Sequence, residues 1–385
     1  MEALSGSRIR SHNERLVVAL LRDHAPLTRA QLSERLGLTR AAMSRIVGSM
    51  IERNVIDECG ANEASGAGRP GTNLELSKRW AGFGIDARSD RSELLALELG
   101  GATLGRQVLA LPTRPTPAQF VEAVSETLTS HLRSFDHEPT GLGIAIPGTI
   151  SNDRRTVLLS HHFGWENVPL VELLSERIDL PIALRHGAEC AAIANARQPA
   201  LSESQRLLHV QIGTGLGLAL TRNRDLDETL PVGWGGAGHV SLGDPTSRCV
   251  CGRQGCVDTI VGFGAFAGAG LSAGLSLPAG LDGMTDFAHQ MGALAEQGHP
   301  FAIDALESLA TKLGRILSVF ITIEVPDSVT LGGYVTALGE PFLDRLDEVL
   351  SSHLLASSPI VRTELGARAA AIGAAMVGLN LITTL

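Results

Sequence analysis

The stretch HVSLGDPTSRCVCGRQGC, residues 239–256, contains the side chains most typical of metal chemistry. One histidine is followed by three of the chain's five cysteines, which fall within eight positions. An imidazole and three thiolates form a closed tetrahedral set that suits a structural zinc ion, because it leaves no position for a catalytic water. Three reduced core cysteines without a metal are the alternative. We predict a zinc (Zn) site with four ligands: His239, Cys249, Cys251 and Cys256.

The composition is that of a globular protein with a charge asymmetry along the chain. The 385 residues are 44% hydrophobic and 19% charged, with a net charge of −9. Residues 1–80 carry 12 Lys and Arg against 9 Asp and Glu, whereas the remainder carries 20 against 32. A basic head on an acidic body indicates that only the head meets polyanions.

Targeting signals and disulfides are not expected. Met1–Arg10 has no apolar run, and the uncharged residues 259–281 contain six glycines, so we predict neither a signal peptide nor a membrane span. Cys59 and Cys190 stand alone and suggest no disulfide framework. These features favour a cytoplasmic protein.

The head, residues 1–80, has the pattern of a winged helix-turn-helix. Apolar residues recur at helical spacing in three stretches before residue 52. Thr28 and Thr39 are expected to cap the second and third helices, and Gly37 to end the second. VIDECG (55–60) and TNLELS (72–77) are predicted strands joined by a Gly-rich wing.

The third helix of this head is the predicted recognition helix. Its polar face would enter the major groove of double-stranded DNA, and an arginine in the wing would contact the minor groove or the phosphates. Arginines that merely solvate a helix face are the alternative. The predicted DNA contacts are Thr39, Arg40, Ser44, Arg45 and Arg69.

The body alternates strand-like and helical stretches, which predicts an α/β fold. The clearest strands are residues 141–150, 180–184, 207–220 and 328–333, several of which end in glycines. A turn such as GTGLG (213–217) can lie close to a phosphate, but glycines end many buried strands.

In sequence order, these motifs resemble the ROK family of repressors and sugar kinases from about Arg8 onward. The matching segments are GRP (68–70), GIAIPG (143–148), GW (164–165) with VPL (168–170), LP (180–181), GTGLG (213–217), GH (238–239), the cysteine cluster and GG (332–333). The resemblance implies an actin-like (ribonuclease H-like) body with two lobes around a sugar cleft. It also makes the His-Cys cluster the family's zinc site, in the body rather than in the DNA-binding head.

The expected domains follow from the same resemblance. The head is the winged helix-turn-helix domain (1–80), residues 81–187 form the small lobe, joined by a C-terminal helix at about 366–385, and residues 188–365 form the large lobe with the zinc site.

The chemistry of the family's kinases is missing from the matching positions. Their first phosphate loop reads Asp-x-Gly-x-Thr, whereas this chain has Arg88 in place of the glycine and Asp90 in place of the threonine. Their Asn-Asp catalytic pair corresponds to His186 and Gly187, and glycine cannot accept a proton. We therefore predict that the protein is not an enzyme.

The sugar-contacting positions are altered as well. The resemblance places four polar residues at an effector site: His162, His186, His239 and Asp258. The resemblance also places Arg185 and His161 near the cleft, with an outward orientation of these two side chains as the alternative. Because the imidazoles of this cluster gain charge as the pH falls toward about 6.5, a sugar acid or sugar phosphate is the hypothesised ligand. A pocket that has drifted and binds nothing is the alternative.

The resulting prediction is a transcriptional regulator, expected to repress carbohydrate-related genes. It would bind a palindromic operator as a homodimer or homotetramer, with no membrane partner, and sense a sugar or sugar derivative. The alternatives are a ROK sugar kinase with a DNA-binding head, and a regulator whose body serves only protein interaction.

Overall fold

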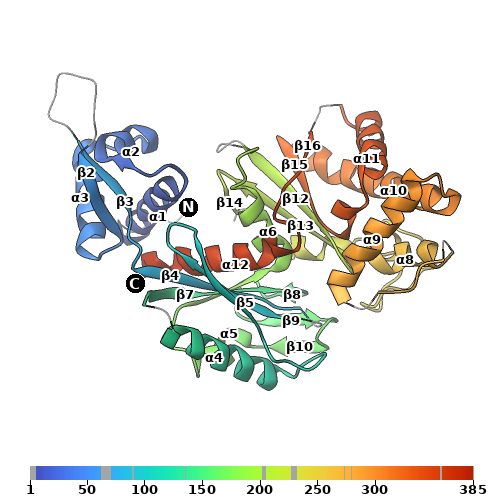
Figure 1. Cartoon of the computed structure of the whole chain (residues 1–385), viewed down its shortest axis with the longest axis horizontal. Coiled ribbons are helices and arrows are strands. Elements are labelled where there is room, and N and C mark those ends of the chain that lie inside the picture. Colours follow the sequence, from blue (N-terminus) through green and yellow to red (C-terminus); the bar gives the residue numbers. More distant parts are fainter. Residues whose placement is uncertain are drawn as a thin grey trace.

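The computed structural model shows a head, a small lobe and a large lobe arranged around one central helix (Figure 1). It describes residues 6–61, 71–88, 91–134, 136–201, 205–226, 232–272, 274–278, 280–355 and 358–384. Among these residues, no helix is both long and apolar enough to cross a membrane.

The head is a winged helix-turn-helix, as predicted. Its described elements are α1 (Gly6–His24), β1 (Leu27–Thr28), α2 (Arg29–Leu36), α3 (Arg40–Glu52), β2 (Ile56–Ala61) and β3 (Thr72–Leu76). The strands form an antiparallel sheet in the order β1-β3-β2. The side chain of Thr28 accepts from the backbone N–H of Gln31, and that of Thr39 accepts from Ala42, so each caps its helix. Gly37 has a φ of +63°, which ends α2 in the left-handed conformation.

The small lobe is built on a mixed sheet. Its elements are β4 (Trp80–Asp86), β5 (Glu93–Glu98), β6 (Thr103–Val108), α4 (Pro117–Ser134), β7 (Glu138–Ile146), β8 (Thr149–Ile150), β9 (Val157–Ser160), β10 (Trp165–Val168), α5 (Leu170–Ser175) and β11 (Ile182–His186). The main sheet has the order β11-β7-β4-β5-β6, and β8, β9 and β10 form a separate antiparallel sheet. Apolar residues of α4 and α5 pack on the main sheet to form the core of this lobe.

The large lobe repeats this topology. Its elements are α6 (Gly187–Asn195), β12 (Arg206–Ile212), β13 (Leu216–Arg222), β14 (Asp225–Leu226), η1 (Val232–His239), α7 (Asp258–Val261), α8 (Phe263–Ser272), α9 (Gly280–Glu296), α10 (Pro300–Glu324), β15 (Ser328–Gly333), η2 (Tyr334–Ala337), α11 (Glu340–His353) and β16 (Ile360–Val361). The sheet order is β14-β13-β12-β15-β16. In each lobe, three consecutive antiparallel strands are extended by two parallel ones, as expected for a ribonuclease H-like body.

Two of the predicted strands are corrected by the structure. Residues 207–220 form two antiparallel strands, β12 and β13, because the glycines at 213 and 215 turn the chain. Residues 141–150 likewise divide into the end of β7 and the short strand β8.

The chain ends in η3 (Gly366–Arg368), α12 (Ala369–Asn380) and η4 (Leu381–Thr384), and α12 returns to the small lobe. This helix, red in Figure 1, lies along the small-lobe sheet beneath the head. A Cβ atom on Gly84 of β4 would lie 2.1 Å from the Ala375 backbone nitrogen, and one on Gly143 of β7 would lie 2.0 Å from the Ala374 oxygen. Glycine at these two strand positions therefore allows α12 to approach the sheet closely.

Candidate functional site

The predicted zinc ligands meet in the large lobe. His239 ends η1, and the cysteines follow on a loop held by bridges between Ser241 and Cys256 and between Arg248 and Gln254. The potential ligand atoms of the four residues (His239, Cys249, Cys251 and Cys256) all lie within 4.8 Å of one another, so the cluster could hold a metal ion.

The chemistry of this donor set fits a thiophilic divalent cation. The Cys249 Sγ lies 3.6 Å from His239 Nδ1, and the Cys251 and Cys256 sulfurs are also 3.6 Å apart. Burial, together with hydrogen bonds to the neighbouring thiols, raises the pKa of Cys256 to about 12. Three adjacent thiolates need a positive charge between them, which Zn²⁺ would supply while taking imidazole as its fourth ligand.

Asp258 connects the metal cluster to the Gly-rich turn between β12 and β13. Its Oδ1 accepts a 2.7 Å hydrogen bond from the Leu216 N–H, and its Oδ2 lies 3.4 Å from His239 Nδ1. Burial raises the pKa of this carboxyl group. A Cβ on Gly238 would lie 1.8 Å from Asp258 Oδ1, so the Gly-His pair leaves room for the carboxylate.

The two remaining predicted effector residues lie at the same turn. His162 Nε2 is 3.1 Å from the Thr214 hydroxyl, which makes a contact between the two lobes. His186 caps α6 by accepting from the Ala188 N–H, and its ring lies against Gly217, where a Cβ would be 3.1 Å from Cε1. The structure thus brings all four predicted effector residues around residues 213–217.

The environment of His186 opposes protonation of its ring. Burial lowers the pKa of this imidazole most, and the electrostatic influence of His162 lowers it further, against the opposing influence of Glu189. A charged His186 is therefore less favourable than the hypothesis of an anion-binding imidazole assumes.

Sequence reasoning missed an ion pair beside His186. Arg154, in the loop between β8 and β9, contacts Glu189 through two hydrogen bonds of 2.8 and 3.0 Å. Glu189 also accepts from the His186 N–H. A glutamate three residues after a capping residue is a recognisable capping box, but no local pattern points to Arg154.

His161, for which an outward orientation was an alternative, faces the site. Its ring meets that of His239 edge-on, with centroids 6.2 Å apart. Arg185 donates to the Leu184 carbonyl.

The predicted recognition helix presents its polar face to solvent. Arg40, Ser44 and Arg45 of α3 are exposed, whereas Met43, Val47 and Met50 are buried on the opposite side. Among the described residues, neither Arg40 nor Arg45 makes an ion pair, so both guanidinium groups are available to a ligand. Arg69 lies outside the described residues.

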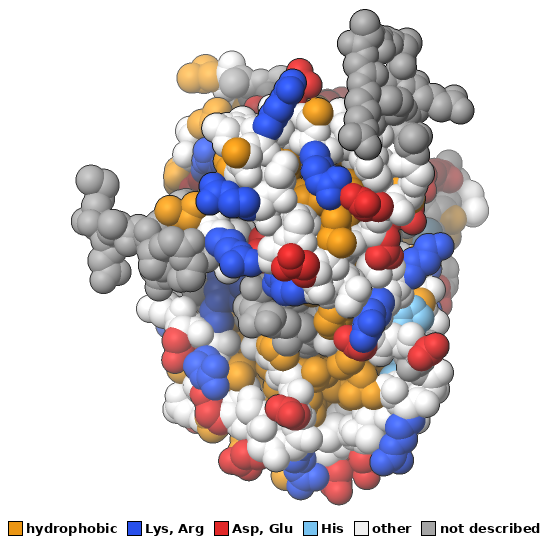
Figure 2. Space-filling model, turned by 90° about the vertical axis from the view of Figure 1, so that its left-hand side faces the viewer, with side chains coloured by type: hydrophobic (Ala, Val, Ile, Leu, Met, Phe, Trp, Pro, Cys, Tyr) orange, Lys and Arg blue, Asp and Glu red, His pale blue; other side chains and the backbone are white. Residues whose placement is uncertain are grey.

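On the face drawn in Figure 2, Lys and Arg side chains are spread over the upper part of the molecule, where the head lies, with acidic side chains between them. Within the head, Arg29 and Glu58 form a 2.8 Å ion pair. This face therefore has no single, strongly basic patch.

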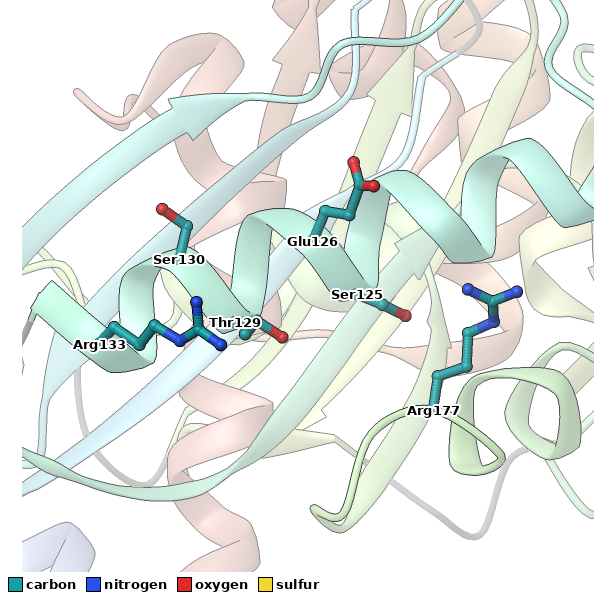
Figure 3. A pocket seen from close by; sticks show the side chains of 6 residues that line it. All are labelled: Ser125, Glu126, Thr129, Ser130, Arg133 and Arg177. Carbon is teal, nitrogen blue, oxygen red and sulfur yellow. The ribbon is translucent and has the colours of Figure 1, made fainter.

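A hollow of about 600 Å³ lies outside this site, on the outer face of α4. Figure 3 shows Arg133 and Arg177 at either end of it, with the hydroxyl groups of Ser125 and Thr129 between them. None of the predicted site residues lines it.

Comparison with known proteins identifies the body. A sequence model of the ROK family matches residues 83–381. The chain belongs to the ROK family. A model of the MarR family matches residues 11–64, which include all three helices of the head from residue 11 onward.

Similar proteins include a named transcriptional regulator and a named repressor. NagC of Escherichia coli strain K12, a DNA-binding transcriptional dual regulator, is 23% identical over 376 residues, covering 95% of this chain and 92% of that protein. The xylose repressor of Caldicellulosiruptor bescii is 22% identical over 350 residues, covering 88% of this chain and 87% of the repressor.

Solved ROK structures have the same fold. A ROK family transcriptional regulator, a homologue of the Escherichia coli Mlc protein, has a TM-score of 0.79 at 19% identity and covers 98% of both chains. A ROK glucokinase from Streptomyces griseus, solved with glucose and AMPPNP, has a TM-score of 0.64 at 24% identity and covers 77% of this chain and 99% of its own. The predictions of family and fold class are confirmed.

The positions that match the ROK kinase motifs hold different residues in this chain. The Arg88 side chain contacts residues close to it in sequence. Its Nε donates to the Arg91 carbonyl at 3.1 Å and lies 3.8 Å from Asp86 Oδ2. Among the described residues, no atom outside the chain neighbours and the α6 backbone lies within 4 Å of a Cβ built on Gly187. Asp90 lies outside the described residues.

Proposed function

We propose that this ROK family protein is a DNA-binding transcriptional repressor of carbohydrate-related genes with a non-catalytic body. The observation that carries the proposal is the exposed face of α3, with Arg40 and Arg45 unpaired among the described residues, on a body that has Gly187 at the position of the kinase base. The named regulator and the named repressor among its relatives support the same function.

The binding test starts from a pool of random duplexes from which the protein selects its own operator. We expect a palindrome, because a symmetric oligomer presents two heads. Arg45→Ala should weaken binding by about 1–3 kcal/mol if this side chain contacts a base, and Arg40→Ala and Arg69→Ala should weaken it as well.

Arg345→Ala is the matched control, because it removes the same charge from α11, far along the large lobe, where Arg345 pairs with Glu348 at 2.8 Å. Its affinity should equal that of the unaltered protein. Unchanged affinity in the three head variants would contradict the proposed interface.

The proposal also assigns roles within the body. One structural zinc ion would bind His239, Cys249, Cys251 and Cys256, and a sugar or sugar derivative would bind at His162, His186, His239 and Asp258. The lowered pKa of His186 and the ion pairing of Arg154 favour an uncharged, hydroxyl-bearing ligand over an anion. The proposed domains are residues 1–80, residues 81–187 with about 366–385, and residues 188–365, in a cytoplasmic homodimer or homotetramer.

Titration calorimetry with xylose, N-acetylglucosamine and their acidic derivatives tests the effector. A neutral sugar should bind equally well at pH 6 and pH 8, and His162→Ala should weaken it. Binding that is confined to the acidic derivatives would contradict the preference for a neutral sugar. A separate ATP-coupled assay with the same sugars tests for kinase activity, which we expect to be absent.

A further inference from the structure

The last turn of α1 contacts both lobes of the body. The Arg22 side chain donates to the Leu99 carbonyl at 3.1 Å and to Asn380 Oδ1 at 3.4 Å, on the small lobe and at the end of α12. The adjacent residue, Asp23, accepts a 2.9 Å hydrogen bond from Arg224 of the large lobe. Two consecutive residues of α1 therefore bind different lobes, Arg22 the small lobe and Asp23 the large lobe.

Arg224 occupies a backbone conformation that does not suit it. It forms the turn between β13 and β14 with Asn223, and the two residues have φ values of +63° and +53°. Such a two-residue turn favours Asn followed by Gly, since a side chain with a Cβ is disfavoured in the left-handed region. Arginine at the second position thus gains nothing locally, but the turn directs its guanidinium to the head.

Asp23 also breaks a local preference. It lies in the last turn of α1, where the free carbonyl groups make a negative charge unfavourable. The ion pair compensates for both departures. Its side chains are only 15% and 16% exposed, so solvent and salt screen it weakly.

Further contacts fix Arg224 on the large lobe. Its Nη2 donates to the Leu201 carbonyl at 3.3 Å, and its own carbonyl accepts from Arg197 at 2.6 Å. Figure 1 shows β14 on the side of the large lobe that faces the head.

Strand β13 continues from this turn to the cleft. It begins at Leu216, whose N–H is bound by Asp258, and ends at Arg222, next to the turn. It is paired with β12 on one side and β14 on the other, so it moves as part of the sheet. A displacement of the large lobe at the cleft therefore reaches Arg224.

We propose that Asp23 and Arg224 are positioning residues that set the orientation of the DNA-binding head by the position of the large lobe. Arg22 holds the same helix end to the small lobe, so a change in the angle between the lobes must move the head or break the ion pair. The inference rests on the proposed function, because it makes this ion pair the link between occupancy of the cleft and the spacing of two heads on DNA.

Distances between spin labels test the positioning directly. The labels are carried by non-natural amino acids at the exposed positions Glu34 in the head and Asp347 in the large lobe, which leaves the native cysteines in place. Arg224→Gly suits the turn and removes the whole side chain with its guanidinium, and Asp23→Ala removes the partner carboxylate. We expect both to broaden the distance distribution, whereas the control Asn223→Gly, which changes the same turn but keeps Arg224, should match the unaltered protein.

Binding to the selected palindrome and to its half-site gives a second measurement. In Arg224→Gly, affinity for the palindrome should fall by about tenfold, because two heads that are no longer fixed to the large lobe lose effective concentration, while affinity for the half-site stays the same. Three results would overturn the proposal. They are distance distributions in both variants that superimpose on that of the unaltered protein, an equal broadening in Asn223→Gly, and an unchanged affinity of Arg224→Gly for the palindrome. A protein that binds no duplex would instead remove the proposed function, and the distances would still decide whether the ion pair orients the head.

Discussion

The two carboxylate oxygens of Asp258 serve different parts of the site. One fixes the Leu216 N–H at the Gly-rich turn, and the other faces His239 beside the cysteine cluster. His239 is thus shared between a metal site and the cleft. Anything that displaces this imidazole will also disturb the turn that carries Thr214 and Leu216.

Cys251→Ser should lower metal content and thermal stability together, because a serine hydroxyl is a much poorer zinc ligand than a thiolate. Metal affinity should fall by more than about tenfold, because loss of a group that only hydrogen-bonds to a metal ligand already costs about that much. Elemental analysis and thermal melting measure the two quantities. The control is Cys59→Ser, which removes a thiol from β2 of the head and should leave the zinc content unchanged. Full metal content with an unchanged melting temperature in Cys251→Ser would refute a structural role of the metal.

Buried His209 provides a second residue-scale prediction, on pH. Its Nδ1 is 3.0 Å from the Thr330 hydroxyl and its Nε2 is 3.2 Å from Gln211 Oε1, so a neutral ring satisfies both partners. Burial lowers the pKa of His209 to about 4. The unfolded chain, with a histidine pKa of about 6.5, binds a proton that the folded protein does not take up until pH 4.

The folded protein should therefore lose about 3 kcal/mol of stability from His209 as the pH falls from 6.5 to 4, and regain it as the pH rises. Urea unfolding at several pH values measures this slope. His209→Gln should flatten it, and His12→Gln, at an exposed position of α1, should leave it unchanged. Equal slopes in His209→Gln and the unaltered protein would show that this imidazole does not titrate as argued.

At the scale of elements, the packing of α12 depends on the absence of side chains on β4 and β7. Gly84→Ala would place its Cβ 2.1 Å from the Ala375 backbone nitrogen, and a backbone atom cannot move aside as a flexible side chain can. We expect a loss of about 1–3 kcal/mol in the free energy of unfolding. Gly264→Ala, in α8 with no atom within 4 Å, should be neutral or slightly stabilising, and equal stability of the two variants would contradict this account.

The elements that were predictable from sequence are those with local signals. Thr28, Gly37 and Thr39 mark helix ends by their own side-chain and backbone preferences, and the structure has them in those roles. The sequence predicts residues 207–220 as one strand, because glycines end many buried strands and do not by themselves mark a hairpin turn. The structure divides them into β12 and β13. The pairs Arg154–Glu189 and Asp23–Arg224 join residues distant in sequence, and no periodicity or spacing encodes such contacts.

At the scale of the whole molecule, the head and the body share one apolar core. Val17 and Leu21 of α1 belong to the same buried cluster as Leu97 of β5 and Leu379 of α12. Trp80, where the head meets β4, donates its indole N–H to the Asn54 carbonyl at 2.7 Å. We therefore expect the head and the small lobe to unfold as one cooperative unit.

Leu379→Ala should destabilise this unit by about 2–5 kcal/mol, since Leu379 is fully buried between the head and the sheet. Hydrogen exchange should accelerate together in α3 of the head and in β4 of the small lobe. The exposed Leu355→Ala is the matched control and should leave both rates unchanged. Faster exchange in β4 with an unaffected α3 would show that the head is stable on its own.

The position of α12 in the chain also constrains the order of assembly during translation. Residues 369–380 leave the ribosome after β4, β7 and every helix of the head, yet they cover the glycine-lined face of the sheet and complete the core beneath α1. Until they emerge, the nascent chain exposes that apolar face. Docking of the head on α12 is therefore completed only after every element of the two lobes has been synthesised, and the chain before that point is a natural client for chaperones that bind exposed hydrophobic strands.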